Sequence, residues 1–123
     1  MKRVLLKLSG EALAGDKKTG FDEATCIGVA KQVKKIVDQG IQVAIVTGGG
    51  NFWRGRTSET IDRTKADQIG MLATVMNCIY VSEIFRSVGM NVILRILSFS
   101  RFSLHLSVEH SLPCFQKMQQ WKH

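Results

Sequence analysis

The 123-residue sequence has little cysteine, a single proline and no long hydrophobic run. Its three cysteines, Cys26, Cys78 and Cys114, lie far apart without Cys-x-x-Cys spacing, which argues against a metal site or a disulfide framework and favours buried free thiols. No stretch of about 18 apolar residues occurs, so no membrane span is expected. Lys7 and Glu11 interrupt the apolar stretch near the N-terminus, which argues against a signal peptide. We therefore predict a cytoplasmic protein.

Acidic residues are also scarce relative to basic ones. Seventeen Lys and Arg face ten Asp and Glu, which gives a net charge of +7. A basic balance suits nucleic acid or a small phosphorylated ligand. The basic residues are scattered singly or in pairs, without a basic run, so the small ligand is favoured and nucleic-acid binding is not predicted.

Hydrophobic periodicity predicts alternating strands and helices within one domain. Apolar runs indicate strands at residues 3–10, 41–47 and 90–96. The order β-α-β-α-β predicts parallel strands that are joined by helical crossovers.

Two amphipathic helices and a polar loop connect these strands. Asp22 is the expected N-cap of a helix through Asp38, and a long helix follows from about residue 62 to 88. Residues 11–20 are expected to form the loop. The apolar positions of the long helix form one line: Ile69, Leu72, Val75, Met76, Ile79 and Ile84.

Glycines follow two of the predicted strands, in KLSG (7–10) and TGGGN (47–51). Ligands of parallel sheets bind at the carboxyl ends of strands, where backbone N–H groups without a Cβ approach phosphate oxygens closely. The run is neither a Walker A loop nor a GxGxxG fingerprint, so a tight turn is the alternative. Phe52 and Trp53 next to it are core residues or a pocket wall, and we favour core.

Charged residues near these glycines have two interpretations each. Lys7 either points to solvent from an edge strand or neutralises a phosphate. Arg54 and Arg56 either hold phosphate oxygens or are solvated surface residues. Asp67, in the first turns of the long helix, is a surface carboxylate or an acceptor for substrate hydroxyls.

Three motifs, KLSGEAL, VTGGGNFWRG and ADQIGMLATVMN, resemble the bacterial uridylate kinase (UMP kinase) family of the amino-acid kinase superfamily in order and spacing. GMLATVMN (70–77) distinguishes this family from acetylglutamate kinases and aspartokinases. The resemblance implies an α/β three-layer sandwich with a mostly parallel sheet. Residues 1–96 would be its N-terminal, UMP-binding part.

The resemblance implies transfer of the γ-phosphoryl group of ATP, with Mg²⁺, to UMP in pyrimidine nucleotide synthesis. Lys7 and Arg54 would be catalytic. The implied ATP contacts are Lys7, Leu8, Ser9, Gly10, Gly50 and Arg54, and the implied UMP contacts are Gly49 and Asp67. The segment that matches the GTP-activation region of the family comprises Gly15, Asp16, Lys17, Lys18, Thr19 and Gly20. No protein ligand for a metal is predicted. Family members are homohexamers, and the long helix is expected in a subunit interface.

Residues 97–123 are predicted to form a divergent tail of helix or coil. The tail holds all three histidines and the only proline but no glycine. Because Met and Trp have single codons, KMQQWKH back-translates with little freedom. Read one base earlier, it gives Asp or Asn, Ala, Ala or Thr, Val or Met, Glu, and Ala or Thr, and CFQK before it can give Phe-Ser-Lys. The reading FSKDAAVEA resembles the family at this point. We therefore expect a frameshifted or truncated gene product; a natural tail is the alternative.

The second half of the family would supply the adenine pocket and further catalytic residues. A UMP kinase of doubtful activity is therefore the expected function. The alternative is an inactive fragment that retains a phosphate-binding loop or co-assembles with full-length subunits.

Overall fold

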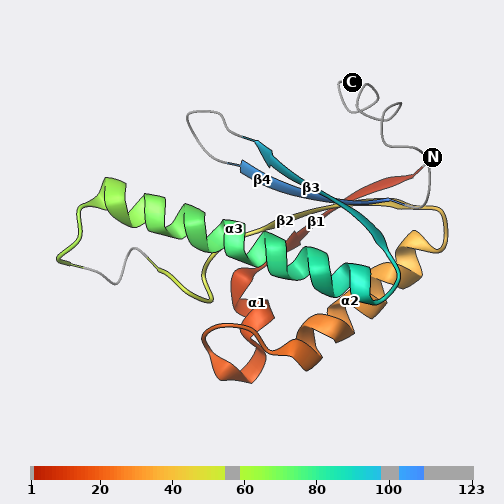
Figure 1. Ribbon diagram of the computed structural model, residues 1–123, viewed down its shortest axis with the longest axis horizontal. Coiled ribbons are helices and arrows are strands. Elements are labelled where there is room, and N and C mark those ends of the chain that lie inside the picture. Colours follow the sequence, from red (N-terminus) through yellow and green to blue (C-terminus); the bar gives the residue numbers. More distant parts are fainter. Residues whose placement is uncertain (1, 55–58, 98–102, 110–123) are drawn as a thin grey trace.

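A computed structural model describes residues 2–54, 59–97 and 103–109 (Figure 1). Arg56 lies outside the described residues, and so do residues 98–102 and 110–123 of the predicted tail, Cys114 among them. The elements in chain order are β1 (Arg3–Leu8), α1 (Gly10–Ala14), the 3₁₀ helix η1 (Gly15–Lys17), α2 (Glu23–Val37), β2 (Gln42–Thr47), α3 (Arg63–Ser87), β3 (Asn91–Leu97) and β4 (Ser103–Glu109).

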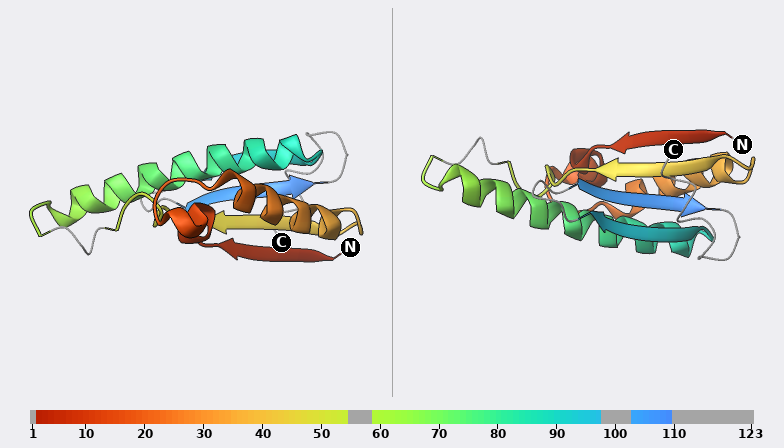
Figure 2. Two further views of the ribbon diagram at one scale, coloured as in Figure 1. Left: turned by 90° about the horizontal axis from the view of Figure 1, so that it is seen from below. Right: turned by 90° about the horizontal axis from the view of Figure 1, so that it is seen from above.

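The four described strands form one sheet in the order β1-β2-β4-β3. Strands β1 and β2 pair in parallel, with Leu8 opposite Thr47 at their carboxyl ends. Strand β4 lies antiparallel between β2 and β3 (Figure 2). The α/β class is thus confirmed, and the sheet is mostly parallel, because β1, β2 and β3 run in one direction and β4 in the other.

Strand β4 corrects the prediction for residues 103–109, which were expected in helix or coil. The sequence SLHLSVE alternates polar and apolar residues, which is the pattern of a strand. Its backbone pairs with β2 on one side and β3 on the other. The connection from β2 through α3 to β3 therefore leaves one strand position free between β2 and β3, and β4 occupies it.

The described helices all cover one face of the sheet, so these residues form two of the three predicted layers (Figures 1 and 2). The predicted N-cap of α2 is confirmed, because the Asp22 side chain accepts a hydrogen bond from the Thr25 N–H at the start of the helix. The core between helices and sheet is formed by Leu8, Leu13, Cys26, Ala30, Val33, Val37, Val43, Ile45, Val81, Phe85, Met90 and Val92.

Helix α3 does not bury the apolar line that the sequence indicates. Ile69, Leu72, Met76 and Ile79 are between 37% and 66% exposed. The buried positions are instead Ala66, Ala73, Asn77, Cys78, Val81, Ser82 and Phe85. By length and composition alone α3 could cross a membrane, a test that core helices also pass, and 33% of its most apolar window is buried.

The segment after β1 is also more regular than predicted. Residues 11–17, expected in a loop, belong to α1 and η1. Ser9 begins α1, because its hydroxyl accepts a hydrogen bond from the Glu11 N–H. Leu13 and Ala14 then pack into the core, each 1% exposed.

Two predicted free thiols are confirmed, since Cys26 and Cys78 are both buried and unpaired. Burial raises the pKa of the Cys78 thiol from 9.0 to about 11. It also raises the pKa of Cys26, with a smaller contribution from the nearby Asp22 carboxylate.

Candidate phosphate-binding site

The two glycine-bearing strand ends meet, as the sequence predicts. A Cβ at Gly10 would lie 2.4 Å from the carbonyl oxygen of Gly48 and 2.8 Å from the nitrogen of Gly50. Such distances exclude any side chain, so Gly10 is required for α1 to begin against the glycine loop, residues 48–50.

The glycine loop packs with equal closeness against α3. A Cβ at Gly49 would lie 2.8 Å from both the Ala73 Cβ and the Gly70 carbonyl oxygen. The small residues of the loop and of α3 therefore allow the backbone of the loop to contact the surface of the helix. The loop is held between the start of α1 and the N-terminal half of α3.

The carbonyl groups and N–H groups of this loop differ in their partners. The Gly48 carbonyl accepts a hydrogen bond from Asn77 Nδ2 at 2.6 Å, and the Gly49 carbonyl accepts from the N–H groups of Phe52 and Trp53. Within the described residues, the N–H groups of Gly49 and Gly50, which lie beyond the strand ladder, donate no hydrogen bond. Two successive backbone donors without an acceptor are suited to an anion.

An ion pair lies beside the loop. Arg54 Nη2 is 2.6 Å from Glu11 Oε1, and both side chains are 57% exposed. The same Oε1 lies 3.4 Å from the position of a Cβ on Gly50. Exposed pairs of this kind stabilise a fold by no more than about 1 kcal/mol. The pair places the Arg54 guanidinium beside the glycine loop.

The other predicted phosphate contacts lie at the end of β1. Lys7 is exposed in an edge strand and is paired with Val46, in agreement with either interpretation of this residue. Leu8 is 8% exposed and belongs to the core, and it is paired with Thr47 in the sheet. The Ser9 hydroxyl already caps α1.

The predicted UMP contacts share one neighbourhood. Gly49 touches Gly70, and Asp67 lies three residues earlier, on the same face of α3. Asp67 is exposed.

The prediction that Phe52 is a core residue is wrong. This side chain is 39% exposed, and its ring lies 5.2 Å from that of Phe21 in an edge-on arrangement. Trp53 is half-buried, with its Cδ1 3.6 Å from the Cβ position of Gly70. Its indole nitrogen has no acceptor among the described residues.

Residues 15–20 contact the residue that follows the glycine loop. The Thr19 hydroxyl and the Gly20 N–H both donate to the Asn51 carbonyl, at 2.9 and 3.0 Å. Gly15, Lys18 and Gly20 have positive φ and form the bends of the segment. Asp16, Lys17 and Lys18 are exposed.

Asn51 and Asn77 are site residues that the sequence prediction missed. They are 1% and 0% exposed and hydrogen-bond to each other. Asn77 carries a usable signal, because it lies four residues from Ala73 and from Val81 on the buried line of α3. A polar residue on such a line requires a hydrogen-bond partner.

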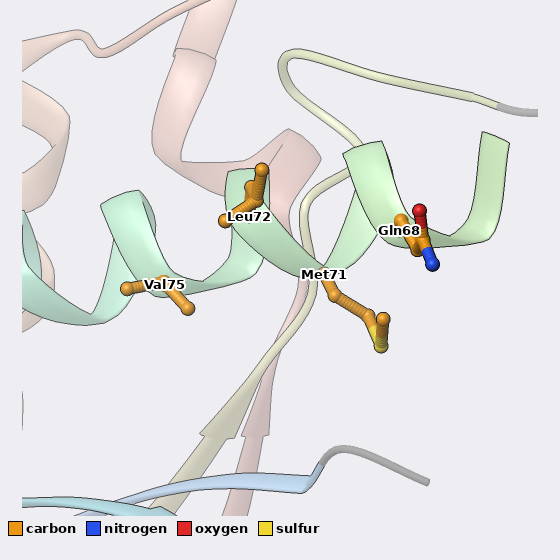
Figure 3. A pocket seen from close by; sticks show the side chains of 4 residues that line it. All are labelled: Gln68, Met71, Leu72 and Val75. Carbon is orange, nitrogen blue, oxygen red and sulfur yellow. The ribbon is translucent and has the colours of Figure 1, made fainter. Parts of the chain in front are cut away.

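A separate pocket of about 310 Å³ lies on α3 (Figure 3). Gln68, Met71, Leu72 and Val75 line it, and none of these is a predicted site residue. Among the described residues, no group of three His, Cys, Asp or Glu side chains gathers as a metal site would require.

Comparison with known proteins identifies the class of fold. The model of the amino acid kinase family matches residues 2–116. The chain belongs to the amino acid kinase family.

Particular relatives agree with the resemblance seen in the motifs. The chain is 52% identical over 90 residues to the uridylate kinase of Limosilactobacillus reuteri and 51% identical to that of Pediococcus pentosaceus. These matches cover 72% of this chain but only 38% and 37% of the relatives. The chain thus spans less than two fifths of the curated relatives it matches.

Solved structures give the same result. The UMP kinase of Bacillus anthracis is similar with a TM-score of 0.66 and 44% identity, over 70% of this chain and 36% of that one. The UMP kinase of Ureaplasma parvum has a TM-score of 0.65 and 32% identity, over 73% and 40%.

Proposed function

We propose that this chain is the N-terminal, nucleotide-binding part of a UMP kinase. The observation that carries the proposal is the glycine loop, whose Gly49 and Gly50 N–H groups have no acceptor among the described residues and lie where β1 and β2 end. The uridylate kinase relatives supply the reaction class: transfer of the γ-phosphoryl group of ATP to UMP.

Each site residue has a role in this proposal. Lys7 and Arg54 stabilise the charge of the transferred phosphoryl group, since phosphoryl transfer depends on positioning and electrostatics. Leu8, Ser9, Gly10 and Gly50 contact the ATP phosphates. Gly49 and Asp67 bind UMP. Mg²⁺ arrives with ATP and neutralises its phosphate charge, and no described residue is assigned to it as a ligand.

Assembly and regulation belong to the same proposal. The exposed row of Ile69, Leu72, Met76 and Ile79 supports a subunit interface along α3, in a homo-oligomer that is a hexamer in the family. Residues 15–20 are the proposed GTP-activation segment. The free thiols Cys26 and Cys78 suit the reducing cytoplasm.

A coupled assay of ADP release with UMP and ATP tests the enzymatic function. Turnover that disappears in Lys7→Ala but persists in Lys31→Ala, an exposed lysine of α2, supports the proposal. Wild-type protein that neither binds nucleotide nor turns it over contradicts the proposal.

A second candidate is a chain that binds nucleotide without turnover or co-assembles with full-length subunits, and the contacts of the glycine loop support it as well, since they lie within the described residues. Nucleotide binding in the absence of ADP release supports it.

A frameshifted or truncated gene product is part of the proposal as well. Sequencing of the encoding DNA downstream of codon 94 tests this origin. A second frame that continues the similarity to uridylate kinases is expected, and one intact frame without such a continuation would contradict it.

A further inference from the structure

The side chains of Asn51 and Asn77 form a buried amide pair. Asn51 Nδ2 donates to Asn77 Oδ1 at 3.1 Å, and Asn77 Nδ2 donates to Asn51 Oδ1 at 2.6 Å. The two residues are 1% and 0% exposed. They come from different elements, one directly after the glycine loop and the other in the middle of α3.

The remaining N–H group of each amide binds a backbone carbonyl. Asn77 Nδ2 donates to the Gly48 carbonyl at 2.6 Å, and Asn51 Nδ2 donates to the Gly20 carbonyl at 2.9 Å. All four side-chain N–H groups are therefore used. The amide pair joins α3, the glycine loop and the Thr19-Gly20 turn.

The bond to Gly48 determines the direction of a neighbouring donor. The chain has no cis peptide bond among the described residues, and in a planar trans peptide the C=O of one residue and the N–H of the next point in opposite directions. A Gly48 carbonyl held toward Asn77 therefore directs the Gly49 N–H away from Asn77. That N–H has no acceptor among the described residues.

Glycine residues cannot hold this direction by themselves. With no Cβ, each glycine samples a wide range of φ and ψ, so a run of three has little intrinsic preference for one orientation. The carbonyl of Gly49 is fixed by the N–H groups of Phe52 and Trp53. The carbonyl of Gly48 accepts from Asn77 Nδ2 at 2.6 Å and from the Thr47 hydroxyl at 3.4 Å, so Asn77 makes the shorter of its two hydrogen bonds.

We infer that Asn77, supported by Asn51, is a positioning residue that directs the Gly49 N–H toward the phosphate of a nucleotide. Asn77 itself touches no ligand in this scheme and acts through the Gly48 peptide. The inference rests on the proposed function only for the identity of the anion.

The test compares Asn77→Ala with Cys78→Ala in the full chain. Both residues are buried on adjacent positions of α3, so the second variant controls for a general loss of packing. Two readouts are needed: the ¹⁵N order parameter of the Gly49 N–H without ligand, and the affinity for UMP and ATP. Asn77→Ala is expected to lower the order parameter and to weaken binding at least tenfold relative to Cys78→Ala.

A second variant covers the case in which Asn77→Ala fails to fold. Asn77→Asp keeps the size of the side chain, but its carboxylate has no proton to donate to Gly48. The protonated acid has one, and burial raises the pKa of such a group. Lowering the pH is therefore expected to restore the order of the Gly49 N–H in Asn77→Asp, while Cys78→Ala changes little.

The outcomes separate the inference from the proposed function. Wild-type protein that binds neither nucleotide contradicts the proposed function, and the order parameter still decides the inference. A Gly49 N–H that is as ordered in Asn77→Ala as in Cys78→Ala overturns the inference. Equal nucleotide affinity in these two variants overturns it as well.

Discussion

The two halves of α3 meet different demands. The N-terminal half, through Asn77, contacts the glycine loop with Gly70 and Ala73 and extends past the end of the sheet (Figure 1). The C-terminal half lies over the sheet and buries Val81 and Phe85, each 1% exposed. One continuous helix thus provides a site wall at one end and a core element at the other.

The difference shows that size, and not hydrophobicity alone, decides which face of a helix is buried. Where a backbone loop touches the helix, only small or hydrogen-bonding side chains fit, so the large apolar ones are exposed. Where the helix covers a sheet, large side chains fill the space between them.

The largest expected effect is a loss of stability in the C-terminal half. Phe85→Ala removes a fully buried ring, and such changes lower the free energy of unfolding by about 3–5 kcal/mol. Urea unfolding that is followed by circular dichroism measures it. A loss below about 1 kcal/mol would mean that this half does not carry the core.

A smaller loss, accompanied by a loss of binding, is expected where the glycine loop meets the N-terminal half. Gly49→Ala places a Cβ 2.8 Å from the Ala73 Cβ and the Gly70 carbonyl oxygen, and overpacking of this kind costs about 1–3 kcal/mol. UMP and ATP affinity should fall with it, as measured by calorimetric titration.

Gly28→Ala in α2 is the matched control for Gly49→Ala. Apart from its chain neighbours and the backbone of its own helix, no atom of the described residues lies within 4 Å of its Cβ position, so Gly28→Ala should keep binding and gain up to about 1 kcal/mol of helix stability. Equal effects of the two substitutions would contradict the close contact.

Cys78, at the boundary between the two halves of α3, should make the free energy of unfolding depend on pH. Because burial raises the pKa of Cys78 from 9.0 to about 11, the unfolded chain loses this proton first. The neutral thiol contributes its full amount to the free energy of unfolding below pH 9, and this contribution is lost as the pH rises toward 11. Between pH 7 and 10 the loss should be about 1 kcal/mol. The measurement is the unfolding free energy relative to Cys78→Ala, and parallel curves for the two proteins would refute it.

The smallest effect is expected at the exposed row of the N-terminal half. Leu72 is 66% exposed, so Leu72→Ala should change the unfolding free energy of the monomer by less than about 0.5 kcal/mol. If α3 forms a subunit interface, the same substitution should lower the oligomeric mass that light scattering reports. A large loss of monomer stability would place Leu72 in the core instead.

Much of the fold follows from local sequence patterns. Apolar runs locate β1, β2 and β3, and the polar cap at Asp22 locates the start of α2, because these elements depend on nearby residues. The glycine loop and its neighbour Gly10 are also predictable, since parallel strands end at the same edge of a sheet.

The position of β4 and the buried face of α3 are not predictable in this way. The alternation in SLHLSVE indicates a strand but does not say between which strands it inserts. The apolar row of α3 indicates a face that avoids water but does not say whether the sheet or another surface covers it.

The sequence by itself determined the order β1, α2, β2, α3 and β3, the glycine-rich strand ends and the motifs of the amino acid kinase family, because each depends on residues close together in the chain. Only the tertiary structure decided that Asn51 meets Asn77, that Gly49 rests on Ala73 and that Glu11 pairs with Arg54. These contacts join residues that are far apart in sequence, and their geometry exists only after the strands and helices have packed.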